Sequence, residues 1–180
     1  ITQERSDWIN DITSLLNEIQ WKPTQTIRAG FGQGTTLVTP VAVARYVSAI
    51  ANEGTVYDAH IVDRIMDEDG NVVKDVEPSI FNQIEISDDI WAAIKTGMKG
   101  VVSPEDGGTA AQAFTDRNFI EKYLETESFA GKTGTAQVGA RTTNIDIENT
   151  SWFVCFAPRE QPEIAIVVCV PYGLSGSSSA

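Results

Sequence analysis

Residues 131–137 read GKTGTAQ, a run of small and hydroxyl-bearing residues around one lysine. A strand that contains glycine lets another backbone approach closely, and backbone N–H groups can then stabilise an oxyanion. Gly134 would provide that access. Thr133 and Thr135 can donate hydrogen bonds to a carboxylate, and Lys132 adds a positive charge that holds an anion and assists proton transfer. The stretch predicts one wall of an acyl-transfer site for a peptide with a free carboxylate.

The tripeptide Lys-Thr-Gly occurs a second time, at residues 95–97. A lone copy can also be an ordinary turn between strands. Here it lies within residues 87–102, where large apolar residues recur at helical spacing after Ser87, a predicted N-cap, and two acidic residues. This pattern predicts a helix that carries Lys95 and Thr96 mostly on its solvated face. We therefore interpret the second copy as unrelated to the site.

Several stretches around residues 131–137 match one family in their order along the chain. They are GFGQG at 30–34, Thr39-Pro40, ARYVSAIANEGT at 44–55, GGTA at 107–110, WFVCFAP at 152–158 and residues 164–171. Together they resemble the transpeptidase domain of penicillin-binding proteins over about residues 27–176, and most of all the monofunctional class B type. Two positions depart from the usual family pattern, Ala42 in place of glutamine and Cys155 in place of glycine. Residues 1–26 are not matched to the family pattern.

The resemblance implies a fold of the α/β class, α+β in type, with an antiparallel sheet covered by helices. It also implies cross-linking of peptidoglycan, in which an active-site serine attacks a D-Ala-D-Ala amide, releases D-Ala and passes the acyl group to an amine. β-Lactams imitate that dipeptide and acylate the serine. Lys132 matches the motif lysine, Thr133 and Thr135 match the hydroxyls that hold the terminal carboxylate, and the Thr135 N–H matches one oxyanion donor. Gly134 completes the substrate-binding set.

The implied partners are the peptidoglycan stem peptide, β-lactam antibiotics, the N-terminal half of the same protein and proteins of a division or elongation complex. No cofactor, metal or nucleic acid is implied. The family is anchored in the bacterial cell membrane with its catalytic domain on the extracytoplasmic side, and it is linked to cell shape and antibiotic resistance. The expected anchor lies outside this chain.

The two motifs that accompany Lys-Thr-Gly in this chemistry, Ser-x-x-Lys and Ser-x-Asn, do not occur in the chain. We therefore expect residues 1–180 to be the C-terminal portion of a single transpeptidase domain, inactive alone, with the nucleophile and a lysine base in the preceding half. Two alternatives stay open from the sequence. One is a β-lactam sensor or a domain related to serine β-lactamases, and the other is a non-catalytic relative that binds partners.

Composition narrows the function classes. The chain has 180 residues, 42% of them hydrophobic, and 25 acidic against 13 basic residues give a formal net charge of −12. Such a chain is long enough for one core. Its charge disfavours binding to nucleic acid or to anionic lipid. No apolar stretch approaches the roughly 18–20 residues that span a bilayer.

Local patterns predict the remaining elements. They are a helix over about 6–20, a helix from Pro40 to about 53 capped by Thr39 and ended by Gly54, a hairpin of 61–66 with 72–76, and strands over 129–137, 151–157 and 164–170. Short connections make the last three strands antiparallel neighbours. The last strand is apolar throughout, so we expect it to be buried on both faces.

The two cysteines lie on the last two predicted strands. If these strands pair across the short turn at 158–162, Cys155 faces about Ile166, which leaves it roughly 10 Å from Cys169 and out of disulfide reach. We expect two buried, unpaired thiols. A zinc site formed by these cysteines with His60 is disfavoured by the spacing. The four tryptophans are scattered along the chain, as in core packing.

Overall fold

A computed structural model describes residues 3–34, 36–114, 129–137, 149–173 and 175–176. The chain forms two compact units, residues 1–37 and residues 38–180. In the described residues no helix is long and apolar enough to cross a membrane.

The first unit contains two helices. Helix α1 spans Gln3–Ile19, close to the predicted 6–20, and α2 spans Pro23–Gly30, which the sequence reasoning missed. Proline is favoured in the first turn of a helix, and the side chain of Gln25 accepts a hydrogen bond from the Lys22 N–H at 2.6 Å. Trp8 and Trp21 are 63% and 64% exposed, so the expectation that the tryptophans pack in a core is wrong for these two.

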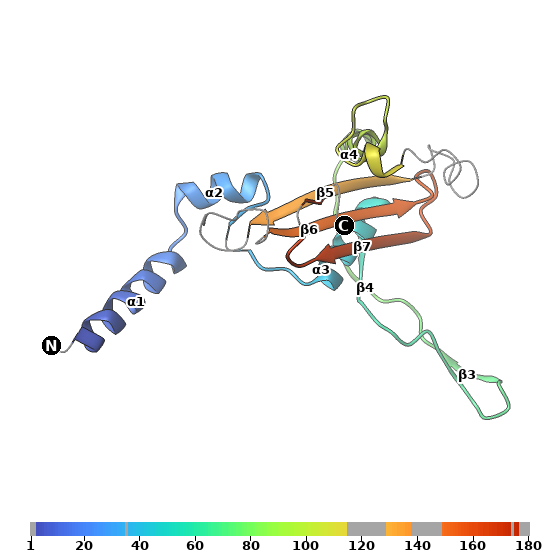
Figure 1. The fold of residues 1–180 in the computed structure, drawn as a ribbon. Coiled ribbons are helices and arrows are strands. Elements are labelled where there is room, and N and C mark those ends of the chain that lie inside the picture. The colour runs from blue at the N-terminus through green and yellow to red at the C-terminus, as the bar shows by residue number, and fades with distance from the viewer. Residues whose placement is uncertain (1–2, 35, 115–128, 138–148, 174, 177–180) are drawn as a thin grey trace. The chain divides into compact units, whose positions relative to one another are not determined.

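The second unit is built on a three-stranded antiparallel sheet, ordered β5-β6-β7. Its strands are Ala130–Gln137, Asn149–Ala157 and Ile164–Val170, as predicted. Two helices pack on it, α3 at Pro40–Ala51 and α4 at Asp88–Val102. Figure 1 shows α4 nearly end-on next to β5, and α3 behind the sheet near β7. The predicted α+β fold with an antiparallel sheet and covering helices is confirmed.

The main core lies between the two helices and one face of the sheet. Because side chains alternate across a strand, residues at even positions of β5 and β6 face the helices. The buried members of this cluster are Val47, Ile50, Ala51, Trp91, Met98, Ala130 and Phe156. Trp91 is 5% exposed, which confirms for this tryptophan the expected role in packing.

The opposite face of the sheet is covered only in part by the described residues. A smaller cluster of Val102, Ala110 and Phe129 packs there with Phe153 among its neighbours. On β7, however, Ile164 and Ile166 are 55% and 44% exposed. The prediction that β7 is buried on both faces is therefore wrong for the described structure.

Helix α3 begins and ends as its sequence predicts. The hydroxyl of Thr39 accepts a hydrogen bond from the Ala42 N–H at 3.2 Å, and Pro40 occupies the first turn. After the helix, Gly54 has a φ of +115°, and a Cβ there would lie 2.3 Å from the Ile84 carbonyl oxygen. Glycine is thus required at this exit by both its backbone angle and the close contact.

Two small pairs of strands follow α3. Strands β1 (Thr55–Tyr57) and β4 (Ile80–Gln83) form an antiparallel pair that the sequence reasoning missed. Strands β2 (Arg64–Met66) and β3 (Val72–Asp75) form the predicted hairpin. At its tip, the carboxylate of Asp67 accepts hydrogen bonds from the backbone N–H groups of Asp69 and Asn71. The side-chain amide of Asn71 also donates to this carboxylate, and this bond, followed by the one from the Asn71 backbone N–H, lowers the pKa of Asp67 most.

The register of β6 with β7 follows the predicted pairing, since Cys155 lies opposite Ile166 and Cys169 opposite Trp152. Both cysteines are free, as expected, but each is half-buried and not fully buried. By the alternation of side chains, Cys155 lies on the partly covered face with Ile166, whereas Cys169 lies on the helix-covered face with Val167. Burial nevertheless raises the pKa of the Cys155 thiol.

Candidate active site on the edge strand

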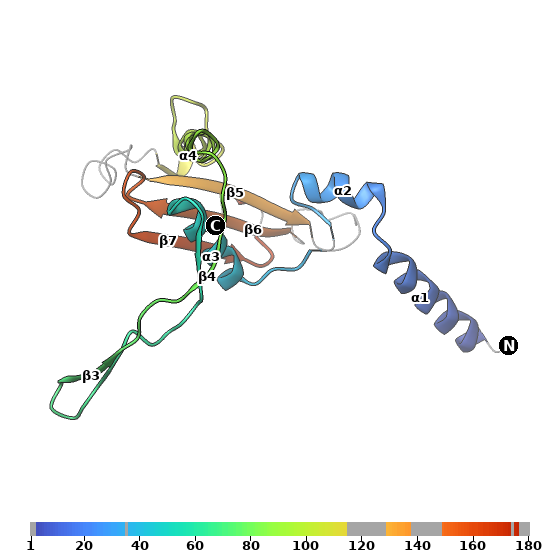
Figure 2. The same ribbon diagram turned by 180° about the vertical axis from the view of Figure 1, so that it is seen from behind.

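Strand β5 carries the motif and lies at one edge of the three-stranded sheet in the described part of the chain. Its register with β6 is regular, with Lys132 opposite Val154 and Thr135 opposite Ser151. Figure 2 shows β5 as the strand next to α4. An edge strand has backbone groups that are not used by a second neighbouring strand. One side of the motif backbone is therefore open among the described residues.

The motif side chains divide between the two faces of the strand. Thr133 and Thr135 share one face because their positions differ by two, and Lys132 belongs to the other. Lys132 is exposed, and its Nζ donates a hydrogen bond to the carbonyl oxygen of Thr133 at 2.6 Å. Among the described residues no carboxylate forms an ion pair with Lys132. Its charge is thus available to an anion at this edge.

The hydroxyl of Thr133 contacts a residue that the sequence reasoning did not assign to the site. The Oγ1 atoms of Thr133 and Thr109 lie 2.9 Å apart, within hydrogen-bond distance. Thr109 follows Gly108, where a Cβ would come 2.2 Å from the Val101 carbonyl oxygen on the last turn of α4. Glycine therefore lets this stretch lie against α4 and reach β5. The only sequence signal for Thr109 was the match of the GGTA stretch to the family pattern.

The hydroxyl of Thr135 contacts a different segment, near the C-terminal end of the described residues. The backbone N–H of Gly176 donates a hydrogen bond to Thr135 Oγ1 at 3.2 Å. Sequence reasoning missed this contact, because nothing local to either residue indicates it. The two motif hydroxyls are thus each bound by a segment distant in sequence.

The two glycines of the motif have different surroundings. A Cβ at Gly131 would lie 2.9 Å from Cζ of Phe153 and 3.1 Å from the Val154 carbonyl oxygen, so a side chain there would force the Phe153 ring to shift. A Cβ at Gly134 would lie 3.3 Å from the Trp152 Cβ, a tight contact with an atom that is fixed to the backbone of β6.

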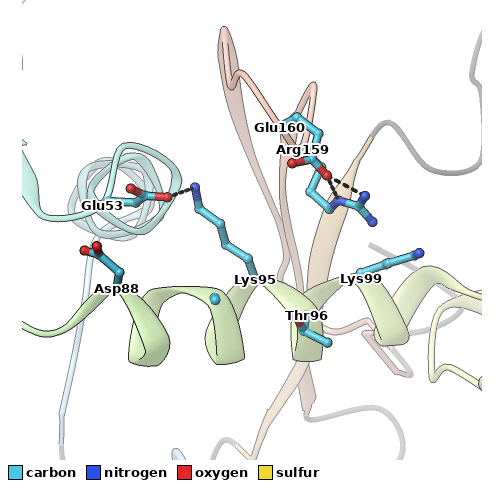
Figure 3. Close-up of a pocket in the computed structure, with 8 residues that line it drawn as sticks. Glu53, Asp88, Lys95, Thr96, Lys99, Arg159 and Glu160 are labelled. Atoms are coloured by element: carbon cyan, nitrogen blue, oxygen red, sulfur yellow. Dashed lines mark hydrogen bonds and ion pairs between the residues drawn. The ribbon is translucent and has the colours of Figure 1, made fainter.

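The second Lys-Thr-Gly copy lies on α4, as predicted, and its two polar side chains border a surface pocket of about 600 Å³. Figure 3 shows the ion pair between Lys95 Nζ and Glu53 Oε1, 2.7 Å apart, and the neighbouring pair of Arg159 with Glu160. Thr96 is exposed, but the side chain of Lys95 is only 16% exposed. The expectation of a solvated Lys95 is therefore corrected, because its ion pair holds it against the surface.

His60 lies on the surface between β1 and β2, and its Nδ1 is 3.0 Å from the Val62 carbonyl oxygen. The described residues contain no group of three or more histidine, cysteine, aspartate or glutamate side chains that could hold a metal ion. The cysteines of β6 and β7 have no such companions in this part of the chain. The residues described here provide no metal centre that would compete with the β5 motif as a candidate site.

Comparison with known proteins gives the family. The sequence model described as "Penicillin binding protein transpeptidase domain" matches residues 3–180. The chain belongs to this family, which confirms the resemblance that its motifs indicate.

Two relatives illustrate the similarity. The chain is 31% identical over 171 residues to the peptidoglycan D,D-transpeptidase MrdA of Haemophilus influenzae, a match that covers 89% of the chain and 24% of the relative. It is 30% identical over 143 residues to penicillin-binding protein 2B of Streptococcus pneumoniae, a match that covers 74% of the chain and 19% of the relative. The chain thus spans about a quarter or less of the length of these curated relatives.

Solved structures of penicillin-binding proteins are similar to this chain. Penicillin-binding protein 2 of Pseudomonas aeruginosa, in complex with WCK 5153, is 33% identical, with a TM-score of 0.62 over 88% of this chain and 30% of that one. Penicillin-binding protein 2B of S. pneumoniae is 28% identical, with a TM-score of 0.67 over 89% of this chain and 25% of that one. The fold described above is therefore part of a known transpeptidase fold.

Proposed function

We propose that this chain forms one wall of the active site of a serine-type peptidoglycan D,D-transpeptidase that is also acylated by β-lactams. One observation supports this most strongly: the motif lies on strand β5, at the edge of the described sheet. Lys132, which forms no ion pair within the described ranges, and the hydroxyls of Thr133 and Thr135 lie on the same short stretch. An exposed strand edge with one cation and two hydroxyl donors suits a peptide that ends in a carboxylate.

Each motif residue has a role in this proposal. The hydroxyls of Thr133 and Thr135 donate hydrogen bonds to the terminal carboxylate of a D-Ala-D-Ala peptide, and Lys132 adds charge stabilisation and assists proton transfer. Gly134 lets the peptide backbone approach β5. The N–H of Thr135 donates to the carbonyl oxygen as it becomes an oxyanion, an interaction that stabilises the transition state more than the substrate.

The reaction proceeds through an acyl-enzyme. A serine hydroxyl adds to the penultimate D-Ala carbonyl, its proton passes to the amide nitrogen, and the terminal D-Ala leaves as a free amino acid. An amine of a neighbouring strand then displaces the serine and restores its proton. A β-lactam forms the same serine ester, but its amide nitrogen stays attached to the acyl group, so no separate amine leaves. The serine is not among the motifs of this chain.

The proposal includes a domain assignment. Residues 1–180 form the C-terminal portion of one transpeptidase domain, and the nucleophile with its lysine base comes from the preceding part of the same protein. Support comes from the missing Ser-x-x-Lys and Ser-x-Asn motifs and from the exposed apolar residues Ile164 and Ile166 on β7. A face of this kind is commonly covered in the complete protein.

The wider context is also part of the proposal. The full protein acts on peptidoglycan outside the bacterial cell membrane, is anchored in that membrane by a segment outside this chain, and works with proteins of a division or elongation complex. Roles in cell shape and in antibiotic resistance follow from that activity. These assignments rest on the family to which the chain belongs.

The test compares two matched substitutions in the full-length protein. Loss of one hydrogen-bond donor to a bound carboxylate costs about 1–3 kcal/mol, so Thr135→Val is expected to slow acylation by a fluorescent penicillin about ten- to a hundredfold. Thr96→Val makes the same change in the second Lys-Thr-Gly copy and is expected to leave the rate unchanged. Thermal melting of each variant checks that the fold persists.

The contrast between the two positions decides the result. Equal losses at Thr135 and Thr96, or a loss only at Thr96, would show that the active-site strand has been assigned to the wrong copy. An unchanged rate in both variants would remove Thr135 from the site.

A further inference from the structure

The stretch after α4 brings a further threonine hydroxyl to the motif strand. The Oγ1 atoms of Thr109 and Thr133 lie 2.9 Å apart, although the two residues are 24 positions apart in sequence. Thr109 is exposed, whereas Thr133 is half-buried. Ordering an exposed side chain costs conformational entropy, so this contact gains importance if the rest of the fold already holds Thr109 in place.

Backbone hydrogen bonds hold Thr109 from both sides. The Gly108 N–H donates to the Ser103 carbonyl oxygen at 3.0 Å, and the Ala110 N–H donates to the Val101 carbonyl oxygen at 2.9 Å. The last carbonyl groups of a helix have no partner within the helix, and these two lie at the C-terminal end of α4. The bonds therefore satisfy the helix end and attach the residues on either side of Thr109 to it.

Packing adds to this attachment. Ala110 is 2% exposed and belongs to the buried cluster that contains Val102 and Phe129. Thr109 thus has a fixed backbone beside the core, while its side chain lies at the surface next to β5. A β-branched side chain has few rotamers. The hydroxyl of Thr109 is therefore presented to Thr133 from a well-defined position.

The chemistry of the two hydroxyls gives the contact a direction. Either oxygen can be the donor in the pair as it stands. A hydroxyl has one proton and two lone pairs, whereas a carboxylate has lone pairs only. A carboxylate at Thr133 requires the Thr133 proton, so the Thr109 proton then points to the Thr133 oxygen. Hydrogen bonds in such a chain polarise and strengthen one another.

We propose that Thr109 is a positioning residue for acylation: its hydroxyl orients the Thr133 hydroxyl as a donor to the carboxylate of the acyl donor. Thr109 acts through Thr133 and does not touch the substrate. The inference rests on the proposed function, in which Thr133 binds that carboxylate.

The experiment measures the second-order rate of acylation of the full-length protein by benzylpenicillin and by its methyl ester, which lacks the carboxylate charge. Thr109→Val keeps the shape of the side chain and removes the hydroxyl. Loss of one such bond corresponds to about a three- to tenfold slower reaction with the free acid. The ester rate is expected to fall less, because a hydrogen bond to a neutral acceptor is about half as strong as one to a carboxylate.

Two further variants serve as controls. Thr109→Ser restores a hydroxyl at the same position and is expected to recover most of the parent rate with the free acid. Thr96→Val makes the same substitution as Thr109→Val at an exposed threonine of α4, and it is expected to change neither rate. Thermal melting of each variant checks that the fold persists.

Combination with Thr133→Val distinguishes positioning from direct contact with the ligand. Residues that act through one another give non-additive effects, so Thr109→Val is expected to cause no further loss in the Thr133→Val protein. A direct contact of Thr109 with the ligand would multiply the two losses instead.

Multiplied losses, equal slowing of acid and ester by Thr109→Val, an unchanged rate with the acid, or no recovery in Thr109→Ser would overturn the inference. If Thr133→Val itself leaves the ratio of acid to ester rates unchanged, the proposed function fails at Thr133 and not merely the role of Thr109.

Discussion

At the scale of single residues, the sequence indicates which motif residues to expect at the site but not the contacts that support them. Lys132, Thr133 and Thr135 were identified from the residue types that bind a carboxylate. Thr109 and Gly176, which bind the two threonine hydroxyls, lie 24 and 41 positions away from them in sequence. No local pattern specifies such pairs, because they arise only when the sheet and its connections have formed.

Ser151 offers a prediction about stability. Its side chain is fully buried beside Gly173, and its Oγ has no hydrogen-bond partner among the described residues. A buried hydroxyl without a partner costs about 1–3 kcal/mol. Ser151→Ala in the full-length protein is therefore expected to leave the free energy of unfolding unchanged or to raise it by about 1 kcal/mol, as measured by urea denaturation.

Ser151→Val is the control, because it adds bulk against Gly173 in a packed site. Overpacking of this kind costs about 1–3 kcal/mol, so the valine variant is expected to be less stable than the parent. A similar loss of stability in the alanine variant would mean that the hydroxyl makes a stabilising hydrogen bond.

At the scale of elements, the sequence predicted the helices and strands that have strong local patterns, but it did not predict the pairing of very short strands. Helices α3 and α4, the β2–β3 hairpin and strands β5 to β7 follow from periodicity, glycine and proline positions and short connections. Strands β1 and β4 have three and four residues and pair across a long stretch of chain, so their pattern is too short to be distinctive. The sequence analysis predicted that both faces of β7 are buried. Apolar composition does not show which element covers a face of a strand, so this prediction overestimated the burial.

The N-cap residues of helices α3 and α4 give a prediction about stability. Thr39 accepts a hydrogen bond from the Ala42 N–H at the start of α3, whereas Ser87, at the N-cap position of α4, makes no side-chain capping bond. Loss of a cap costs about 0.5–2 kcal/mol. Thr39→Ala is expected to lower the free energy of unfolding by about 1 kcal/mol, with a much smaller effect of Ser87→Ala in the same denaturation experiment.

Equal effects of the two alanine substitutions would contradict this reading of the caps. The sequence alone predicted both residues as N-caps, since serine and threonine are both favoured there. Only the structure shows that the Thr39 hydroxyl accepts a capping hydrogen bond and that the Ser87 hydroxyl does not.

At the scale of the whole molecule, the candidate site is one wall of a larger arrangement. Strand β5 provides the residues proposed to bind and polarise the substrate, and the family match places them in a penicillin-binding protein transpeptidase domain. The nucleophilic motif Ser-x-x-Lys is not in the sequence. The central claim is therefore that residues 1–180 bind and position the acyl donor, while the covalent bond forms elsewhere in the same protein.

Mass spectrometry of protein treated with a fluorescent penicillin tests this claim most directly. The full-length protein is expected to gain one acyl group on a peptide outside residues 1–180, and the isolated 180-residue chain is expected to gain none under the same conditions, because it lacks the motif serine. Stoichiometric labelling of the isolated chain, or an adduct on one of its own serines in the full-length protein, would contradict the assignment of β5 as a partner wall.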